Sequence, residues 1–96
     1  MKMFVIVYWS ASDDVVIASL AKIGVNAYTK WTKVLGCGTE TEPKLGSGFW
    51  RGENNVLTAF VNDKDAAKVK DVVMNLREER PWGGIRGFIM PVEEMI

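Results

Sequence analysis

Two glycine-rich turns are the residues of this sequence best suited to contact a ligand. Gly36-Cys37-Gly38 follows an apolar stretch, and Gly83-Gly84 stands just before Arg86. Glycine adopts positive φ without strain and lets a backbone approach a ligand closely, and N–H groups so arranged can form an anion nest. Both turns therefore qualify as sites for an anionic ligand, while the commonest role of such glycines is a simple turn.

Side chains that could catalyse a reaction are scarce. The chain contains no histidine and so lacks a ready acid–base group at neutral pH. Its single cysteine, Cys37, lies between glycines with nothing nearby in sequence to activate it. Motifs with metal-ligand spacing and phosphate-binding loops of the G-x-x-x-x-G-K-[ST] kind are absent. We therefore predict a protein that is not an enzyme and has neither catalytic residues nor a metal site.

The composition indicates one small domain. The chain has 96 residues, 12 basic and 12 acidic side chains and a net charge of zero, so a nucleic-acid partner is disfavoured. No apolar run approaches the roughly 20 residues that span a bilayer, so membrane insertion is not expected. A lone cysteine gives no sign of an oxidising compartment. The cytoplasm is the expected location.

Hydrophobic periodicity predicts four strands and two helices in the order βαββαβ. The strands are expected over 4–9, 27–35, 56–61 and 85–92. The first helix is expected between an N-cap at Ser12 and a stop at Gly24, and the second begins after Asn62 or Asp63 and ends before Pro81. Right-handed crossovers then give an α+β, ferredoxin-like split sandwich, a four-stranded antiparallel sheet with two helices on one face.

The strands carry apolar residues on both faces. The alternating sets in the first strand are Phe4, Ile6, Tyr8 and Val5, Val7, Trp9. Two helices can cover only one face of such a sheet, and an apolar second face cannot be left in water. We expect a second copy of the chain to cover it, since most soluble oligomers are homo-oligomers. Docking on a different subunit is the alternative.

A long connection separates the second and third strands. Residues 36–55 far exceed the two to five residues that a hairpin requires, so we expect a functional insertion within a single domain over 1–96. Phe49, Trp50 and Arg51 are types enriched at interfaces, and we predict that they bind a partner; anchoring the loop to its own domain is the alternative. In the split topology the two glycine turns lie at one end of the sheet but on opposite edges. Only neighbouring subunits can bring them together.

This combination of features resembles the PII signalling superfamily of small trimeric regulators. The resemblance runs the length of the chain, and the matching segments are Ser12-Asp13-Asp14, 20–25, Val34-Leu35-Gly36-Cys37-Gly38 before the long loop, and 83–89 before the last strand. It implies a homotrimer in the cytoplasm that acts in signal transduction and nitrogen regulation. It also implies a long T-loop that docks on a target protein such as a transporter or a metabolic enzyme.

The same resemblance assigns ligand-binding residues. Gly36 and Gly38 would lie against an adenine nucleotide at the base of the T-loop, and Gly83, Gly84 and Arg86 would form the phosphate side of the cleft between subunits. The nucleotide would be an effector rather than a tightly bound cofactor. The chain diverges from the family in these loops, with Arg86 in place of a lysine and Glu93-Glu94 in place of arginines.

Two other classes of protein have this order of strands and helices. An RNA-binding domain of RRM layout is the main alternative, because Arg86-Gly87-Phe88 is similar to part of its RNP1 motif, although here on the last strand. An acylphosphatase-like enzyme would need an arginine in the turn after the first strand, and that turn reads Ser10-Ala11-Ser12.

Overall fold

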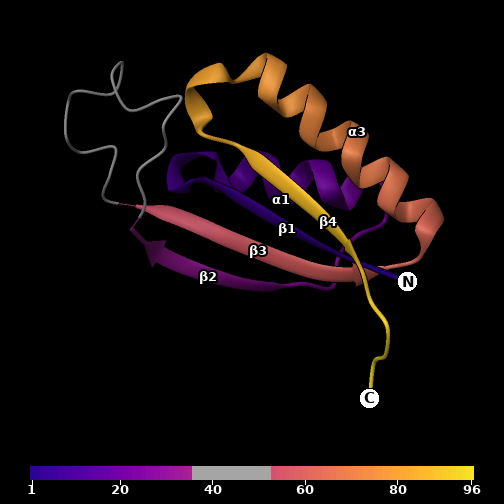
Figure 1. Cartoon of the computed structure of the whole chain (residues 1–96). Coiled ribbons are helices and arrows are strands. Elements are labelled where there is room, and N and C mark those ends of the chain that lie inside the picture. Colours follow the sequence, from indigo (N-terminus) through magenta and orange to yellow (C-terminus); the bar gives the residue numbers. More distant parts are fainter. Residues whose placement is uncertain (36–52) are drawn as a thin grey trace.

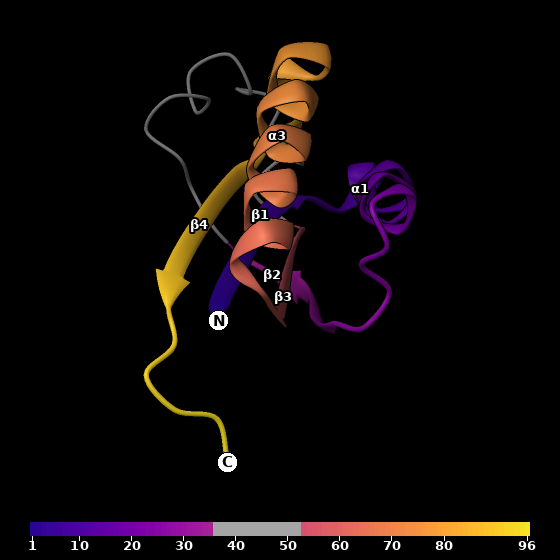
Figure 2. The same ribbon diagram turned by 90° about the vertical axis from the view of Figure 1, so that its right-hand side faces the viewer.

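The computed structural model describes residues 1–35 and 53–96. Its elements follow the predicted order (Figure 1), and their bounds are β1 Lys2–Trp9, η1 Ser10–Ser12, α1 Asp13–Lys22, β2 Thr29–Val34, β3 Asn54–Val61, α3 Asp63–Glu79, η3 Pro81–Gly83 and β4 Arg86–Pro91. The described strands form one antiparallel sheet in the order β2-β3-β1-β4. The described helices α1 and α3 pack on the same face of it (Figure 2). The predicted ferredoxin-like α+β fold is confirmed.

The core lies between that face and the two described helices. Every second residue of β1 is completely buried there, namely Phe4, Ile6 and Tyr8. They meet the stripe of α1 formed by Val16 and Leu20 and the stripe of α3 formed by Val69, Val73 and Leu76. Val72, next to Val73 on α3, is only half-buried against this core. The alternate residues of the strand and the residues at helical spacing therefore pack together in a single core.

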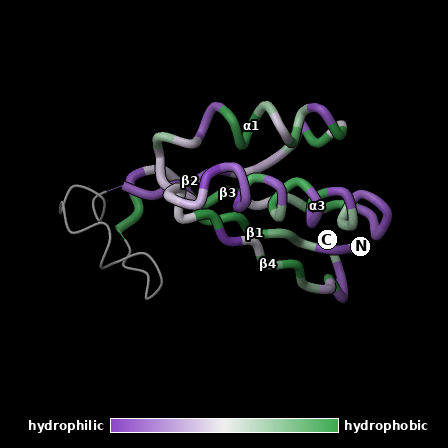
Figure 3. Tube along the Cα trace, turned by 90° about the horizontal axis from the view of Figure 1, so that it is seen from above, coloured by the Kyte–Doolittle hydropathy of each residue, from purple (hydrophilic) through white to green (hydrophobic). Residues whose placement is uncertain are grey.

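The opposite face of the sheet is also apolar within the described residues. Strand register places alternate residues of the described strands on it, and most of them are apolar: Met3, Val5, Val7, Thr29, Trp31, Val56, Thr58, Phe60, Arg86, Phe88 and Met90. We call this set the open face. Trp31, Phe60 and Phe88 are each 52% exposed there, far more than core residues. Hydrophobic segments run along β1, β3 and β4 (Figure 3).

Strand ends differ from the sequence prediction by a few residues. β2 is shorter than 27–35, and its pairing with β3 is irregular between Trp31 and Val34, where Lys33 has a φ of 59°. The positive φ turns the strand at that point and ends its regular alternation. β3 begins at Asn54, so the predicted 36–55 loop extends too far at its end. Asn55 was hidden from a hydrophobic pattern because it is a buried polar residue.

The two helix starts behave differently. The Asn62 side chain caps α3, since its Oδ1 accepts a hydrogen bond from the Asp65 N–H at 2.7 Å. Ser12 precedes α1 as predicted, but its hydroxyl caps nothing. The preceding 3-10 turn holds Ser12 at φ −92° and ψ 4°, outside the extended conformation from which a capping side chain reaches back. The predicted cap is therefore wrong in its chemistry, although the helix does begin there.

These two positions make a matched pair of substitutions. Asn62→Ala should lower the free energy of unfolding by about 1 kcal/mol, because a helix N–H loses its acceptor. Ser12→Ala should change it by less than about 0.5 kcal/mol, because no capping bond is lost and a buried hydroxyl without a partner is removed. Urea denaturation at one protein concentration measures both. An equal loss in the two variants would contradict the assignment of caps.

Candidate functional site

The turn before β4 presents backbone to solvent. Gly84 has a φ of 63°, in the left-handed region, and open space surrounds the point where a side chain would begin. Its neighbours Gly83 and Ile85 are buried and fix the turn to the domain. An exposed left-handed glycine held between two buried residues gives a firmly placed backbone surface, as an anion nest requires.

A second glycine in this turn serves packing. A Cβ on Gly83 would lie 3.2 Å from Ser12 Oγ and 3.3 Å from Ile85 Cδ1. The turn is therefore packed against the start of α1, where Ser12 is 1% exposed and its hydroxyl makes no hydrogen bond. Of the two predicted ligand-contacting glycines described here, only Gly84 faces open space.

Arg86 begins β4 and pairs with Val7, whose side chain belongs to the open face. Partners in an antiparallel register point to the same side of the sheet. The Arg86 side chain therefore projects from the edge of the open face and not toward the helices. A ligand that it contacts would sit where a second subunit could cover that face.

Other predicted site residues fall partly outside the description. Gly36, Gly38, Cys37, Phe49, Trp50 and Arg51 all lie in 36–52, which the structure does not describe. The described ends of the chain around them fit the predicted topology. Val34 at the end of β2 and Arg86 at the start of β4 lie at one end of the sheet, on its opposite edge strands.

A carboxylate network at this same end was not predicted. Asp13 Oδ1 accepts hydrogen bonds from the Tyr8 hydroxyl at 2.7 Å and from Asn55 Nδ2 at 3.1 Å. Lys30 Nζ donates to Asp13 Oδ2 at 2.9 Å. One side chain at the start of α1 thus ties together β1, β2 and β3. From the sequence, Asp13 is only an acidic residue in the first turn of a helix, where the helix dipole favours it. Its partners could not be predicted because they are up to 42 residues away.

The network shifts the pKa of each titratable member. Burial alone would raise the pKa of Asp13, but hydrogen bonds from Tyr8, Lys30 and Asn55 outweigh it and lower the value below 3.8. Burial, followed by the bond to Asp13, raises the pKa of Tyr8. The hydrogen bond to Asp13 raises the pKa of Lys30. These shifts favour a structural role, since none brings a group toward neutral pH where acid–base catalysis operates.

The described residues hold no group of three or more His, Cys, Asp or Glu side chains that could bind a metal ion. None of the helices in the described ranges is long and apolar enough to cross a membrane. At this end of the sheet the described residues place a left-handed glycine, an arginine at the border of the open face and a partly buried carboxylate that holds three strands in register.

The pH dependence of stability tests the network. Because the pKa of Asp13 is lowered by folding, its contribution is complete above 3.8 and is lost as the pH falls below that value. Tyr8 has a raised pKa, so its contribution is complete below 10.0 and is lost as the pH rises further. Asp13→Asn should cost about 2 kcal/mol at neutral pH and flatten the acid limb of the stability curve.

The comparison variant is Asp14→Asn, which removes an adjacent acid outside the network. It should leave the acid limb steep. Chemical denaturation from acid to neutral pH measures both curves, and an unchanged acid limb in Asp13→Asn would show that the carboxylate is not held as described.

Comparison with known proteins identifies the family. The family model described as "Nitrogen regulatory protein P-II" matches residues 1–96. A search of curated proteins gave no match. Among solved structures, a PII-like signalling protein from Thermus thermophilus superposes with a TM-score of 0.62 at 21% identity, over 95% of this chain and 85% of that one. At this identity the second likeness concerns the fold alone. Because the family model spans the whole sequence, the chain belongs to the P-II family of signalling proteins.

Proposed function

We propose that this protein is a non-enzymatic regulator that works as a homotrimer in the cytoplasm. It would bind an adenine nucleotide between subunits and contact a target protein, such as a transporter or a metabolic enzyme, through the loop after β2. The observation that carries the proposal is the apolar open face. P-II proteins are signalling regulators, and this family membership supports the general role.

The open face supports self-association. In the described residues it is lined by apolar side chains on all strands of the sheet, and three of its aromatics are each 52% exposed. Contiguous apolar surfaces of this kind mark protein interfaces. Each subunit of a closed ring would bury this face against its neighbours, which removes it from water without a further element in the chain.

Geometry at the ends of the edge strands supports the nucleotide cleft. The turn with Gly83 and Gly84 precedes the edge strand β4, which Arg86 begins, while Gly36 and Gly38 follow the other edge strand, β2. A ring of subunits would place β4 of one subunit beside β2 of the next. Arg86 then lies at the border of the buried face, where its guanidinium could pair with a phosphate.

The long loop would supply the contact with the target. Phe49, Trp50 and Arg51 are residue types enriched at interfaces, and they are proposed to bind the target protein. The RNA-binding alternative is less well supported, because the chain has a net charge of zero and the middle of β1 gives the open face no ring to form a stacking pair with Phe60 on β3.

Charge placed on the open face should break the assembly. Phe60→Lys puts an ammonium group into the proposed interface, where burial of an unpaired charge is prohibitive. We expect a monomer at micromolar concentration by size-exclusion chromatography with light scattering. Met74→Lys alters an equally exposed apolar residue on α3, outside the open face, and should keep the wild-type mass. A Phe60→Lys variant of unchanged mass would contradict the proposed interface.

Nucleotide binding should stabilise the protein. A nucleotide that binds only the folded state raises the free energy of unfolding by about 2.7 kcal/mol when its concentration is about a hundred times its Kd. We expect at least one of ATP, ADP, AMP and cyclic AMP to raise the melting temperature. Arg86→Ala should weaken that effect about tenfold in apparent Kd, by loss of a charge-assisted bond, whereas Lys64→Ala on α3 should leave it unchanged. If no nucleotide stabilises the protein, the nucleotide proposal fails and the assembly proposal stands.

A further inference from the structure

Lys33 has a backbone conformation that is unusual for its residue type. Among the described residues other than glycine it alone has a positive φ, at 59°. This left-handed conformation brings the Cβ of a lysine close to the following carbonyl oxygen and costs free energy. Strain of this kind persists where the surrounding structure imposes it, most often at binding sites and switch regions. The position of Lys33 is therefore a candidate for a functional role.

A bulge in β2 imposes the conformation. Trp31 pairs with Val56 and Val34 pairs with Asn54, so β2 has one residue more than β3 between the two pairs. With regular alternation Lys33 would stand opposite Asn54 and share the open face with Trp31. The bulge gives that place to Val34 instead. It takes Lys33 out of the row of side chains that the proposed trimer would bury.

The Lys33 side chain has no charged partner within the described part of its subunit. The residue is exposed, and residues 1–35 and 53–96 give its ammonium group no ion pair. The other lysine of β2, Lys30, is by contrast bound to Asp13 at 2.9 Å. A lysine is a point charge on a flexible stem that can bind phosphate. Lys33 is therefore available to an anion outside its own subunit.

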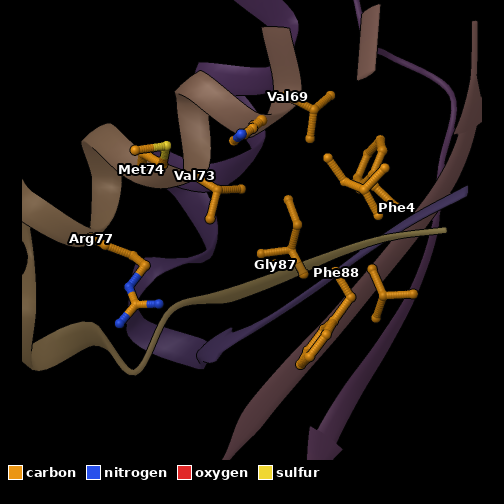
Figure 4. Close-up of a pocket in the computed structure, with 11 residues that line it drawn as sticks. Phe4, Val69, Val73, Met74, Arg77, Gly87 and Phe88 are labelled. Atoms are coloured by element: carbon orange, nitrogen blue, oxygen red, sulfur yellow. The ribbon is translucent and has the colours of Figure 1, made fainter. Parts of the chain in front are cut away.

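The helix side of β4 is apolar next to Arg86. A hollow of about 220 Å³ between α3 and β4 is lined there mainly by apolar side chains, among them Phe4, Val69 and Val73 (Figure 4). Gly87 follows Arg86, and a Cβ on it would lie 3.0 Å from Val73 Cγ1, so α3 packs closely on the strand. A phosphate chain would lose its hydration in such surroundings. From the glycine turn it would therefore extend toward the outer edge of β4.

The proposed ring would bring Lys33 to this edge. Val34, next to Lys33, and Arg86 lie at the same end of the sheet on opposite edge strands. With β4 of one subunit beside β2 of the next, Lys33 of one subunit would approach the Gly84 turn of the other. Arg86 already has a partner within its own subunit, so a chain of phosphates needs a further cation there.

We propose that Lys33 of one subunit and the Gly84 turn of the next together bind the phosphate chain of a nucleoside di- or triphosphate. This site rests on the proposed nucleotide cleft, and it would select nucleotides with two or more phosphates. The N–H groups of the turn would bind the phosphate nearer the sugar, and the Lys33 ammonium group would bind the terminal phosphate, which a monophosphate lacks. Each subunit supplies half of the site, so the site exists only in the assembled protein.

Isothermal titration calorimetry with ADP and AMP tests the role of Lys33. The wild-type protein should bind ADP more tightly than AMP. Lys33→Asn removes the charge and keeps a residue that tolerates the left-handed conformation, so it should weaken ADP about tenfold and AMP less than about twofold. Lys22→Asn removes another exposed lysine, at the end of α1 away from the glycine turn, and should change neither affinity.

Mixed trimers test whether the two halves of the site come from different subunits. Gly84→Asp sets a carboxylate against the phosphates at a position with open space, where aspartate also tolerates a positive φ. Neither Gly84→Asp nor Lys33→Asn should bind ADP tightly by itself. When the two are co-expressed in equal amounts, about one cleft in four should combine an intact Lys33 with an intact Gly84 and bind ADP as the wild type does.

The outcomes separate this site from the nucleotide cleft as a whole. If the wild type binds ADP but Lys33→Asn weakens ADP and AMP to the same extent, or leaves both unchanged, the Lys33 site is overturned and the proposed function stands. Mixed trimers in which no cleft recovers tight binding would overturn the arrangement across subunits. A wild-type protein that binds none of ATP, ADP, AMP and cyclic AMP would overturn the nucleotide function and this site together.

Discussion

The sheet is apolar on both faces, and the described helices cover only one of them. The other features of the protein follow from this constraint. Hydrophobic burial is worth roughly 25 cal/mol per Å², so a face lined by residues such as Val5, Phe60 and Phe88 strongly favours association. Association through this face would also place Arg86 next to the interface, since its side chain lies at the border of that face. Assembly and ligand binding would then be linked, because a cleft between subunits exists only while they are together.

The Asp13 network complements this constraint by fixing one end of the sheet. Its carboxylate takes hydrogen bonds from Tyr8, Lys30 and Asn55, so β1, β2 and β3 keep their register close to the long loop. Charge-assisted bonds to a partly buried acid are among the stronger polar interactions in proteins. The proposed ligand-binding residues would thus lie next to an end of the sheet that is held by hydrogen bonds, as accurate ligand placement requires.

Local patterns in the sequence were enough to predict the fold. The strand and helix patterns gave the correct order of elements, the alternation in β1 includes the core set Phe4, Ile6 and Tyr8, and Asn62 correctly indicated the start of α3. Features that depend on distant contacts were missed. The partners of Asp13 come from three strands, and the failure of Ser12 to cap follows from the turn before it. The predicted sites at Gly36, Gly38 and Phe49 to Arg51 stay predictions, and those at Gly84 and Arg86 have a geometry that suits the proposed role.

Sedimentation equilibrium of the wild-type protein at micromolar concentration tests the central claim most directly. A subunit has a mass of 10.7 kDa. We expect a single species of three times that mass, about 32 kDa, with the open face buried between copies. A stable monomer under these conditions would show that the apolar face is stable in contact with water. It would also contradict the proposed cleft, because that cleft requires two subunits.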